Sequence, residues 1–232
     1  MTPKSNFVVE QVRPARYRHC GGRTFSPPKS SHVKMVTIMT PLVGKIIWVL
    51  GVVGWFIIRY PYDRRARRTP KVRRAVDARE LASIAISATG LGIIPAIYVI
   101  GNVPQFANYP FYWAQAVAGA LVFAAALWLF RRTHKDLGTN WSVTLEVRAE
   151  HKLITEGVYN RVRHPMYSAF WLWAIAQALL LPNWIAGPAG LIGFGSLFFL
   201  RVGREEDLMI ETFGDDYRSY MKRTARVLPG IY

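Results

Sequence analysis

The stretch MYSAFWLWAIAQALLLPNWIAGPAGLIGFGSLFFL, from Met166 to Leu200, contains 35 residues and no charged side chain. As one helix it would extend roughly 52 Å at about 1.5 Å per residue, whereas the hydrocarbon core of a bilayer is only about 30 Å thick. Leu181-Pro182-Asn183 interrupts the run near its middle, and Gly187-Pro188 offers a second break. We therefore expect a hairpin of two short helices, each of about 16 to 18 residues, at the lower limit for crossing a membrane.

Three further apolar segments are long enough to cross a membrane, namely Pro41–Ile58, Leu81–Gly101 and Pro110–Phe130. Only the first contains a charge, Lys45, which lies near its start and is expected to extend its amine towards water. The sequence thus predicts an all-α, multi-pass transmembrane protein with about five spans, the C-terminal hairpin included. Four spans with a re-entrant segment is the alternative.

The distribution of basic residues supports five crossings. Arg59–Arg79 contains nine Lys and Arg residues against two acids, Arg131–Arg163 contains seven, and the segment from Arg201 onward contains six, while Asn102–Asn108 contains none. Cytoplasmic loops are enriched in Lys and Arg, so we expect the three basic blocks in the cytoplasm. Arginine outnumbers lysine 22 to 8, which is typical of GC-rich bacterial genomes and favours a bacterial inner (plasma) membrane.

The N-terminal region does not fit this topology. Residues 1–34 contain seven Lys and Arg residues, would have to be translocated, and lack the apolar core of a signal peptide. Either residues 1–38 form a disordered extension, or the native chain starts at Met35 or Met39. In both cases we expect residues 39–232 to form the membrane domain.

Composition restricts the partners. The net charge is +16 and 51% of the residues are apolar, with charges in blocks between charge-free runs. A nucleic-acid reader mixes its basic residues with polar ones over a folded surface, so we expect membrane lipids as partners and no nucleic acid. Cys20 is the single cysteine, which excludes an internal disulfide and a cysteine-based metal cluster, and we expect no metal. The block at 59–79 is interpreted as an anchor on anionic lipid, with substrate binding as the alternative.

Two polar motifs flank the uncharged run. The first is GVYNRVRHPMY, from Gly157 to Tyr167, in which Pro165 suits the first position of a helix and displaces His164 from the α region. The second begins at Arg201, one helical turn before Glu205. A hairpin returns to the membrane surface from which it left, so the two motifs are predicted to meet there. A structural histidine and a simple anchoring ion pair are the alternatives, although charged groups at this depth are functional candidates.

The order and spacing of these motifs resemble those of the isoprenylcysteine carboxyl methyltransferases, a family grouped with the phospholipid N-methyltransferases. The resemblance extends over about residues 110–228. The residues that carry it are His151, Leu153, Ile154, Gly157, Tyr159, Arg163, His164, Pro165, Tyr167, Arg201, Glu205, Glu206, Phe213, Gly214, Tyr217 and Tyr220. Thr144 departs from the pattern, because eukaryotic members carry a cofactor-contacting glutamine there.

The resemblance implies a methyltransferase whose catalytic part is residues 131–228 and whose methyl donor, S-adenosylmethionine, binds in a cytoplasmic pocket without a Rossmann domain. Arg201 is implied as the catalytic residue that faces a lipophilic, prenylcysteine-like acceptor. The implied cofactor-binding residues are His151, Lys152, Leu153, Ile154, Tyr159, His164, Pro165, Met166, Tyr167 and Glu205.

The residue chemistry agrees with these roles. Glu205 can pair with the ammonium group of the cofactor, and Tyr159, Tyr167 and Trp171 can face its sulfonium or adenine. The loop amides around Gly157 and His164, and the start of the helix at Pro165, can take anionic or hydroxyl groups. A carboxylate acceptor needs no base and is oriented by a bidentate arginine, whereas an amine or thiol must lose a proton, for which His164 is the base in the motif. The alternatives are a phospholipid N-methyltransferase, a small-thiol S-methyltransferase and a non-catalytic protein that binds anionic lipid.

Overall fold

The computed structural model describes residues 38–66, 71–74, 77–138, 146–148 and 153–230. All of them belong to one compact unit, Val36–Tyr232. The predicted N-terminal extension up to residue 37 lies outside the described residues, as do His151, Lys152 and Thr144.

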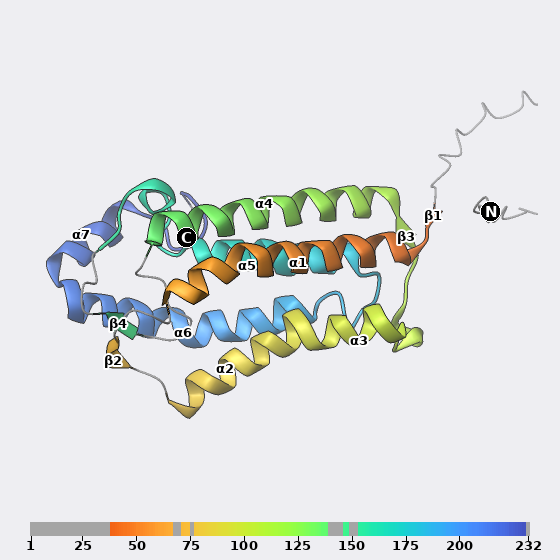
Figure 1. The fold of residues 1–232 in the computed structure, drawn as a ribbon, viewed down its shortest axis with the longest axis horizontal. Coiled ribbons are helices and arrows are strands. Elements are labelled where there is room, and N and C mark those ends of the chain that lie inside the picture. The colour runs from red at the N-terminus through yellow and green to blue at the C-terminus, as the bar shows by residue number, and fades with distance from the viewer. Residues whose placement is uncertain (1–37, 67–70, 75–76, 139–145, 149–152, 231–232) are drawn as a thin grey trace, which may run out of the picture. The chain divides into compact units, whose positions relative to one another are not determined.

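The described chain is dominated by helices, which confirms the predicted fold class (Figure 1). Two short antiparallel strand pairs join β1 (Ile38–Met39) to β3 (Phe111–Tyr112) and β2 (Lys71–Arg74) to β4 (Glu146–Arg148). In the described part of the connections lie the 3₁₀ turns η2 (Gln105–Ala107) and η4 (Gly157–Asn160). The α-helices are α1 (Pro41–Ala66), α2 (Ala78–Ala88), α3 (Ile94–Gly101), α4 (Trp113–Leu137), α5 (Pro165–Leu180), α6 (Ala189–Phe213) and α7 (Asp215–Arg223), and a short π-helix, η1 (Thr89–Ile93), joins α2 to α3.

Three predicted spans coincide with helices that are long and apolar enough to cross a membrane: Pro41–Arg64, Ala78–Gly101 and Trp113–Leu137. The predicted hairpin is also present, because α5 ends at Leu180 and α6 begins at Ala189. Helix α5 has 16 residues and is therefore only about 24 Å long. The chain is thus a multi-pass integral-membrane protein, and the count of five crossings stays a prediction.

A buried asparagine organises the turn of the hairpin. The Asn183 side-chain oxygen accepts hydrogen bonds from the amides of Ile185 and Ala186 at 3.0 and 2.9 Å. Its side-chain nitrogen donates to the Pro104 carbonyl and to Asn108 Oδ1, both at 2.8 Å. The side chain is fully buried, so this amide satisfies the turn internally and ties it to the connection that follows α3.

The prediction for Lys45 is wrong. Its amine does not extend into water, because the residue is only 9% exposed. Nζ donates to the Tyr98 carbonyl at 3.1 Å and to Asn102 Oδ1 at 2.8 Å, and it lies 4.4 Å from the centre of the Tyr98 ring. Asn102 is the left-handed C-cap of α3. Lysine near a helix C-terminus interacts favourably with its last carbonyls, so Lys45 fastens α1 to the end of α3.

Helix α2 and the π-helix pack closely on α6. A Cβ atom on Gly90 would lie 2.3 Å from the Ala189 carbonyl oxygen, and one on Gly193 would lie 2.8 Å from that of Ile86. The buried Gln177 of α5 donates to the Gly90 carbonyl at 3.0 Å. Small residues at this crossing let the two backbones approach each other, which fixes the position of α2 beside the charged part of α6.

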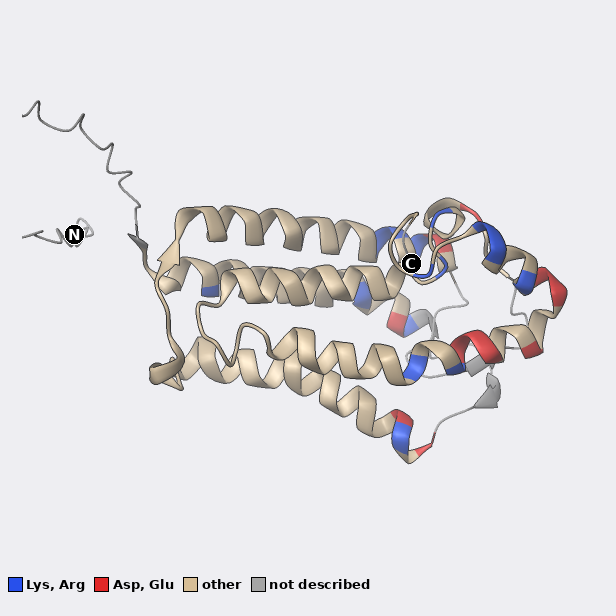
Figure 2. Ribbon diagram, turned by 180° about the vertical axis from the view of Figure 1, so that it is seen from behind, with Lys and Arg blue, Asp and Glu red and all other residues tan. Residues whose placement is uncertain are grey.

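Most of the charged residues in the described part of the chain lie at one end of the helices, where α6 passes into α7 (Figure 2). His164 from the first motif and Glu205 and Glu206 from the second meet there, with Nε2 of His164 3.1 Å from Oε1 of Glu206. The prediction that the hairpin brings the two motifs together is confirmed.

Candidate active site

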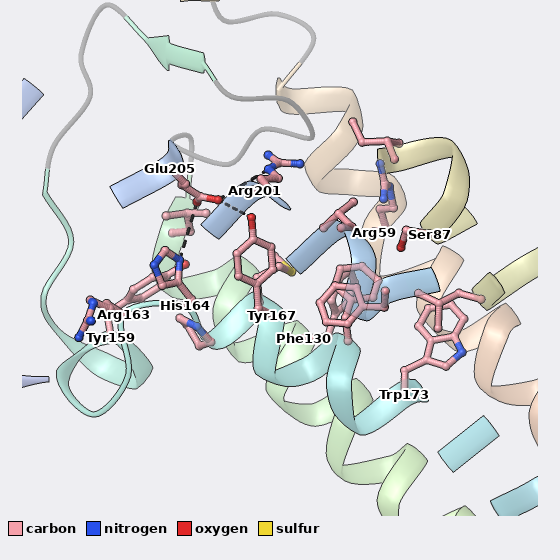
Figure 3. Close-up of a pocket in the computed structure, with 18 of the residues that line it drawn as sticks. Arg59, Ser87, Phe130, Tyr159, Arg163, His164, Tyr167, Trp173, Arg201 and Glu205 are labelled. Atoms are coloured by element: carbon pink, nitrogen blue, oxygen red, sulfur yellow. Dashed lines mark hydrogen bonds and ion pairs between the residues drawn. The ribbon is translucent and has the colours of Figure 1, made fainter. Parts of the chain in front are cut away.

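A cavity of about 480 Å³ lies between helices α1, α2, α4, α5, α6 and α7. This volume falls in the usual range of ligand pockets. Arg59 of α1, Ser87 of α2, Tyr167 of α5 and Arg201 of α6 are among the residues that line it (Figure 3). Six helices, the π-helix η1 and the segment before α5 therefore contribute to this cavity.

The cavity has a polar end and an aromatic arm. Its polar end contains the hydroxyl, imidazole and charged groups of the two motifs. In the aromatic arm the Trp55 and Trp173 rings lie 5.3 Å apart, and those of Phe170 and Phe194 lie 5.4 Å apart. Trp173 follows His164 by nine residues, which places it about 14 Å further along α5. The cavity thus connects a water-side cluster of charges with the apolar layer.

The structure brings together the predicted site residues that it describes. Of the predicted residues, His151 and Lys152 lie outside the described part of the chain. The others all line the cavity: Leu153, Ile154, Tyr159, His164, Pro165, Met166, Tyr167, Arg201 and Glu205. Their common location agrees with the predicted roles, which stay predictions.

Trp171 is an exception among the expected aromatics. It is absent from the cavity wall and packs instead on Phe198 and Phe199, with ring centroids 5.8 and 6.5 Å away. Gly195 leaves the room that its ring occupies, because an added Cβ there would lie 3.2 Å from the Trp171 ring. The expectation that Trp171 faces the cofactor is therefore wrong, and its role is to pack α5 on α6.

Glu205 and Arg201 form the centre of the polar end. The Tyr167 hydroxyl donates to Oε2 of Glu205 at 2.5 Å, and Nε of Arg201 lies 3.7 Å from the same oxygen. Figure 3 shows these three side chains converging from α5 and α6. The Glu205 side chain keeps 30% of its surface exposed, so its carboxylate is accessible from the cavity. Nη1 of Arg201 also lies 3.4 Å from Oε1 of Glu80 in α2.

The neighbouring Glu206 is buried, is not part of the cavity wall, and contacts the side chains of Arg163, His164 and Arg226. Its Oε1 accepts from Nε of Arg163 at 2.7 Å and from Nε of Arg226 at 3.1 Å, and it lies 3.1 Å from Nε2 of His164. Its Oε2 accepts from Nη2 of Arg226 at 2.6 Å. Burial alone would raise the pKa of Glu206, but the hydrogen bonds from His164, Arg226 and Arg163 hold that pKa well below its usual range. The sequence reasoning included Glu206 in the resemblance without assigning this role.

The last described segment fastens the first motif. The amides of Arg163 and His164 donate to the carbonyls of Ala225 and Arg226 at 2.9 and 3.0 Å. The Ser168 hydroxyl donates to the Val227 carbonyl at 2.6 Å, and the Arg163 guanidinium donates to the Thr224 carbonyl. The expectation that the amides near His164 bind anionic groups is therefore wrong, because the C-terminal segment already uses them.

The turn that presents Tyr159 is held from α4 and α7. The Val158 amide donates to Oδ2 of Asp136 at 3.0 Å, so the amide next to Gly157 is also occupied. Gly157 has φ +62, and a Cβ there would lie 2.2 Å from the same oxygen. The Tyr220 hydroxyl donates to the Tyr159 carbonyl at 2.6 Å, and burial raises the pKa of Tyr220 to about 12, which keeps it a donor. Asp136 was missed because no local pattern marks a contact 22 residues away in the sequence.

His164 adopts the local geometry that its sequence predicts. Its backbone lies at φ −124 and ψ 58, outside the α region, and Pro165 begins α5. Its ring stacks on Tyr167 at 5.4 Å, and Nδ1 lies 3.9 Å from Oε1 of Glu205. Proline at the first helical position thus aims the imidazole at both glutamates.

Apolar helices long enough to span a membrane, which together enclose a cavity with charged and aromatic lining, define an integral-membrane protein with an internal cavity. Residues 116–211 match the family model described as the isoprenylcysteine carboxyl methyltransferase (ICMT) family. This match confirms the resemblance of residues 116–211 to that family of methyltransferases.

The curated relatives that match this chain carry the name of the same enzyme. The chain is 31% identical over 138 residues to protein-S-isoprenylcysteine O-methyltransferase of Dictyostelium discoideum, covering 56% of this chain and 54% of that protein. It is 32% identical over 118 residues to the Homo sapiens protein of the same name, covering 50% and 42%. The solved structure of the eukaryotic intramembrane Ras methyltransferase ICMT aligns with a TM-score of 0.46 and 22% identity, over 68% of this chain and 55% of that one. The chain spans about half the length of the curated relatives named here.

Proposed function

We propose that this chain is an S-adenosylmethionine-dependent methyltransferase that methylates the carboxylate of a lipophilic, prenylcysteine-like acceptor. The observation that carries the proposal is that one cavity is lined both by the polar group of Glu205, Tyr167 and Arg201 and by the aromatic arm. A polar methyl donor and an oily acceptor need such a joint site. The names of the relatives support the same chemistry.

The polar end suits the cofactor. When bound, S-adenosylmethionine supplies an electrophilic methyl group on a sulfonium, and it also carries an ammonium and a carboxylate. The Glu205 carboxylate is open to the cavity beside the ring of Tyr167, and Tyr159 and Tyr217 also line this cavity. A carboxylate and aromatic faces are the groups that stabilise such cations. We assign the cofactor to Leu153, Ile154, Tyr159, His164, Pro165, Met166, Tyr167 and Glu205, and to His151 and Lys152 by the sequence resemblance.

The remainder of the cavity suits the acceptor. Arg201 lines the cavity next to Glu205, so we place its guanidinium to orient an anionic acceptor group while the aromatic arm takes the apolar chain. A carboxylate is already ionised and needs no base, so the protein contributes positioning and the exclusion of water. The aromatic walls provide that exclusion.

We place the charged end in the cytoplasm because the described basic residues gather there, as the positive-inside rule requires. The bacterial inner membrane is a prediction from composition alone, since the relatives named above are eukaryotic.

Methyl transfer measured with the detergent-purified protein tests the proposal. Labelled S-adenosylmethionine is supplied with a prenylcysteine, an aminophospholipid or a simple thiol. We expect a base-labile methyl ester on the prenylcysteine and little transfer to the other two. Preferred labelling of the aminophospholipid or thiol would replace the carboxyl assignment with the corresponding alternative, and cofactor binding without transfer to any acceptor would contradict the proposal.

A further inference from the structure

Two ion pairs link the start of α2 to α6. Arg204 contacts Asp77 through Nη2–Oδ2 at 3.0 Å and Nη1–Oδ1 at 3.3 Å, and Nη1 of Arg201 lies 3.4 Å from Oε1 of Glu80. Asp77 and Glu80 are three residues apart at the start of α2, and Arg201 and Arg204 are three residues apart in α6. The earlier residue of one helix pairs with the later residue of the other. They therefore form two rungs between antiparallel helices, and the second rung reaches the cavity through Arg201.

The rungs lie in different environments. In the outer rung the side chains of Arg204 and Asp77 are 34% and 52% exposed, and an exposed pair contributes little to stability. In the inner rung the side chains of Arg201 and Glu80 are 10% and 1% exposed. Neither carboxylate oxygen of Glu80 accepts a hydrogen bond from the described residues, so the pair with Arg201 balances its buried charge.

Such a buried pair is a poor device for stability alone. Desolvating both ions costs free energy, and apolar side chains of similar volume often stabilise a protein as well or better. The pair can instead orient the arginine side chain. A guanidinium is planar and rigid, so a contact at one nitrogen constrains the directions of all five N–H groups. Glu80 lies outside the cavity wall, while Arg201 and Glu205 are part of it.

The first turn of α2 holds Glu80 in place from its backbone. Asp77 is the N-cap and accepts a hydrogen bond from the Glu80 amide at 2.8 Å, and the Ser83 hydroxyl donates to the Glu80 carbonyl at 2.8 Å. The close packing of Gly90 and Gly193 fixes the same helix on α6. Glu80 therefore presents its carboxylate to Arg201 from a rigid element.

We propose that Glu80 is a positioning residue for Arg201, which it holds from behind so that the rest of the guanidinium faces the methyl acceptor. This inference rests on the proposed function, and it makes α2, which lies outside the family match at residues 116–211, part of the acceptor site.

The test compares Glu80→Gln, Glu80→Asp and Arg204→Gln in the purified protein. In Glu80→Gln we expect kcat/KM for the prenylcysteine to fall roughly tenfold to a hundredfold, because small displacements of an orienting group cost about that much. The rise in KM should exceed any change in cofactor Kd. Glu80→Asp keeps the charge and should recover part of the loss. Arg204→Gln breaks the outer rung between the same helices, leaves the Asp77 cap intact, and should retain activity within about twofold.

Two outcomes would overturn the inference in an active enzyme. One is wild-type acceptor kinetics in Glu80→Gln, and the other is equal losses in Glu80→Gln and Arg204→Gln, which would indicate a clamp between helices. Thermal unfolding of Glu80→Gln, Arg201→Gln and the double variant requires no activity. We expect non-additive shifts, because either single change removes the pair, and additive shifts would also refute the inference. If the wild-type protein binds cofactor but methylates no acceptor, the proposed function fails first, whatever the unfolding cycle shows.

Discussion

Glu205 and Glu206 are adjacent in α6, yet the Glu205 carboxylate lines the cavity and the Glu206 carboxylate does not. Glu205 accepts a hydrogen bond from the Tyr167 hydroxyl. Glu206 is buried and contacts Arg163, His164 and Arg226. Successive residues of a helix point about 100° apart, which separates an accessible carboxylate from a buried one. The first is suited to a ligand and the second to holding the motif in place, so the two should respond differently to substitution.

Replacing Glu205 with Ala should weaken S-adenosylmethionine binding roughly tenfold to a hundredfold. A hydrogen bond to a charged group contributes about 1.5–3 kcal/mol, and each 1.4 kcal/mol is about tenfold in Kd. Isothermal titration in detergent measures the affinity. Tyr167→Phe is the matched variant, because it removes the donor to Glu205 and keeps the ring, and it should weaken binding less. Undiminished affinity in Glu205→Ala would remove that carboxylate from the cofactor site.

Replacing Arg201 with Ala should spare cofactor affinity and lower turnover with the prenylcysteine by about two to three orders of magnitude, the usual effect of losing an electrostatic contact made at the reacting group. Arg201→Lys keeps a charge but loses the planar fork, so it should restore only part of the rate. Single-turnover methylation at saturating cofactor separates the two effects. An unchanged rate in Arg201→Ala would show that another group orients the acceptor.

Replacing Glu206 with Ala should destabilise the protein by roughly 3–5 kcal/mol, because it leaves the guanidinium groups of Arg163 and Arg226 without their counter-ion. The folded-state pKa of Glu206 is depressed below its ordinary value of 4.5. Its contribution is therefore fully present above that ordinary value and is lost as the pH falls through the folded-state pKa. Thermal unfolding between pH 7 and pH 3 should show a shallower acid dependence in Glu206→Gln than in the wild type. Equal acid slopes would contradict the assignment.

Gly157→Ala should reduce both stability and activity. The residue has φ +62, which disfavours a side chain, and the added methyl group would meet Asp136 at 2.2 Å. Gly203→Ala in α6 is the control, since nothing lies within 4 Å of its added Cβ and alanine favours a helix. We expect the melting temperature to fall for the first variant and to hold or rise for the second. Comparable melting temperatures would show that the turn before Tyr159 tolerates rearrangement.

Local signals in the sequence predicted much of this fold. The proline and glycine breaks at 181–188 predicted the hairpin, and Pro165 predicted both the start of α5 and the backbone of His164. These features depend on the conformation of a few consecutive residues, which side-chain type largely determines. The meeting of the two polar motifs followed from the hairpin together with the thickness of a membrane.

Contacts between distant segments were not predictable in the same way. Lys45 donates a hydrogen bond near the end of α3, and the amides of residues 163 and 164 donate to the carbonyls of residues 225 and 226. Glu80 pairs with Arg201, which is 121 positions later in the sequence. Each depends on how whole helices pack, and a single sequence carries no periodic signal for it. The family resemblance did not supply Glu80 either, because it begins near residue 110.

The orientation of the site can be tested by labelling single cysteines. In a Cys20→Ser background, cysteines replace Lys135 at the end of α4, Lys222 in α7 and Gln105 between α3 and α4. If the charged end is cytoplasmic, a membrane-impermeant maleimide added to intact cells should label only position 105, and added to inverted vesicles it should label 135 and 222. The described helices require 135 and 222 to react together, because α4, α5 and α6 bring both to the cavity end. Labelling of those two positions from opposite sides would separate the donor site from Arg201, and the proposed methyl transfer would lose its geometry.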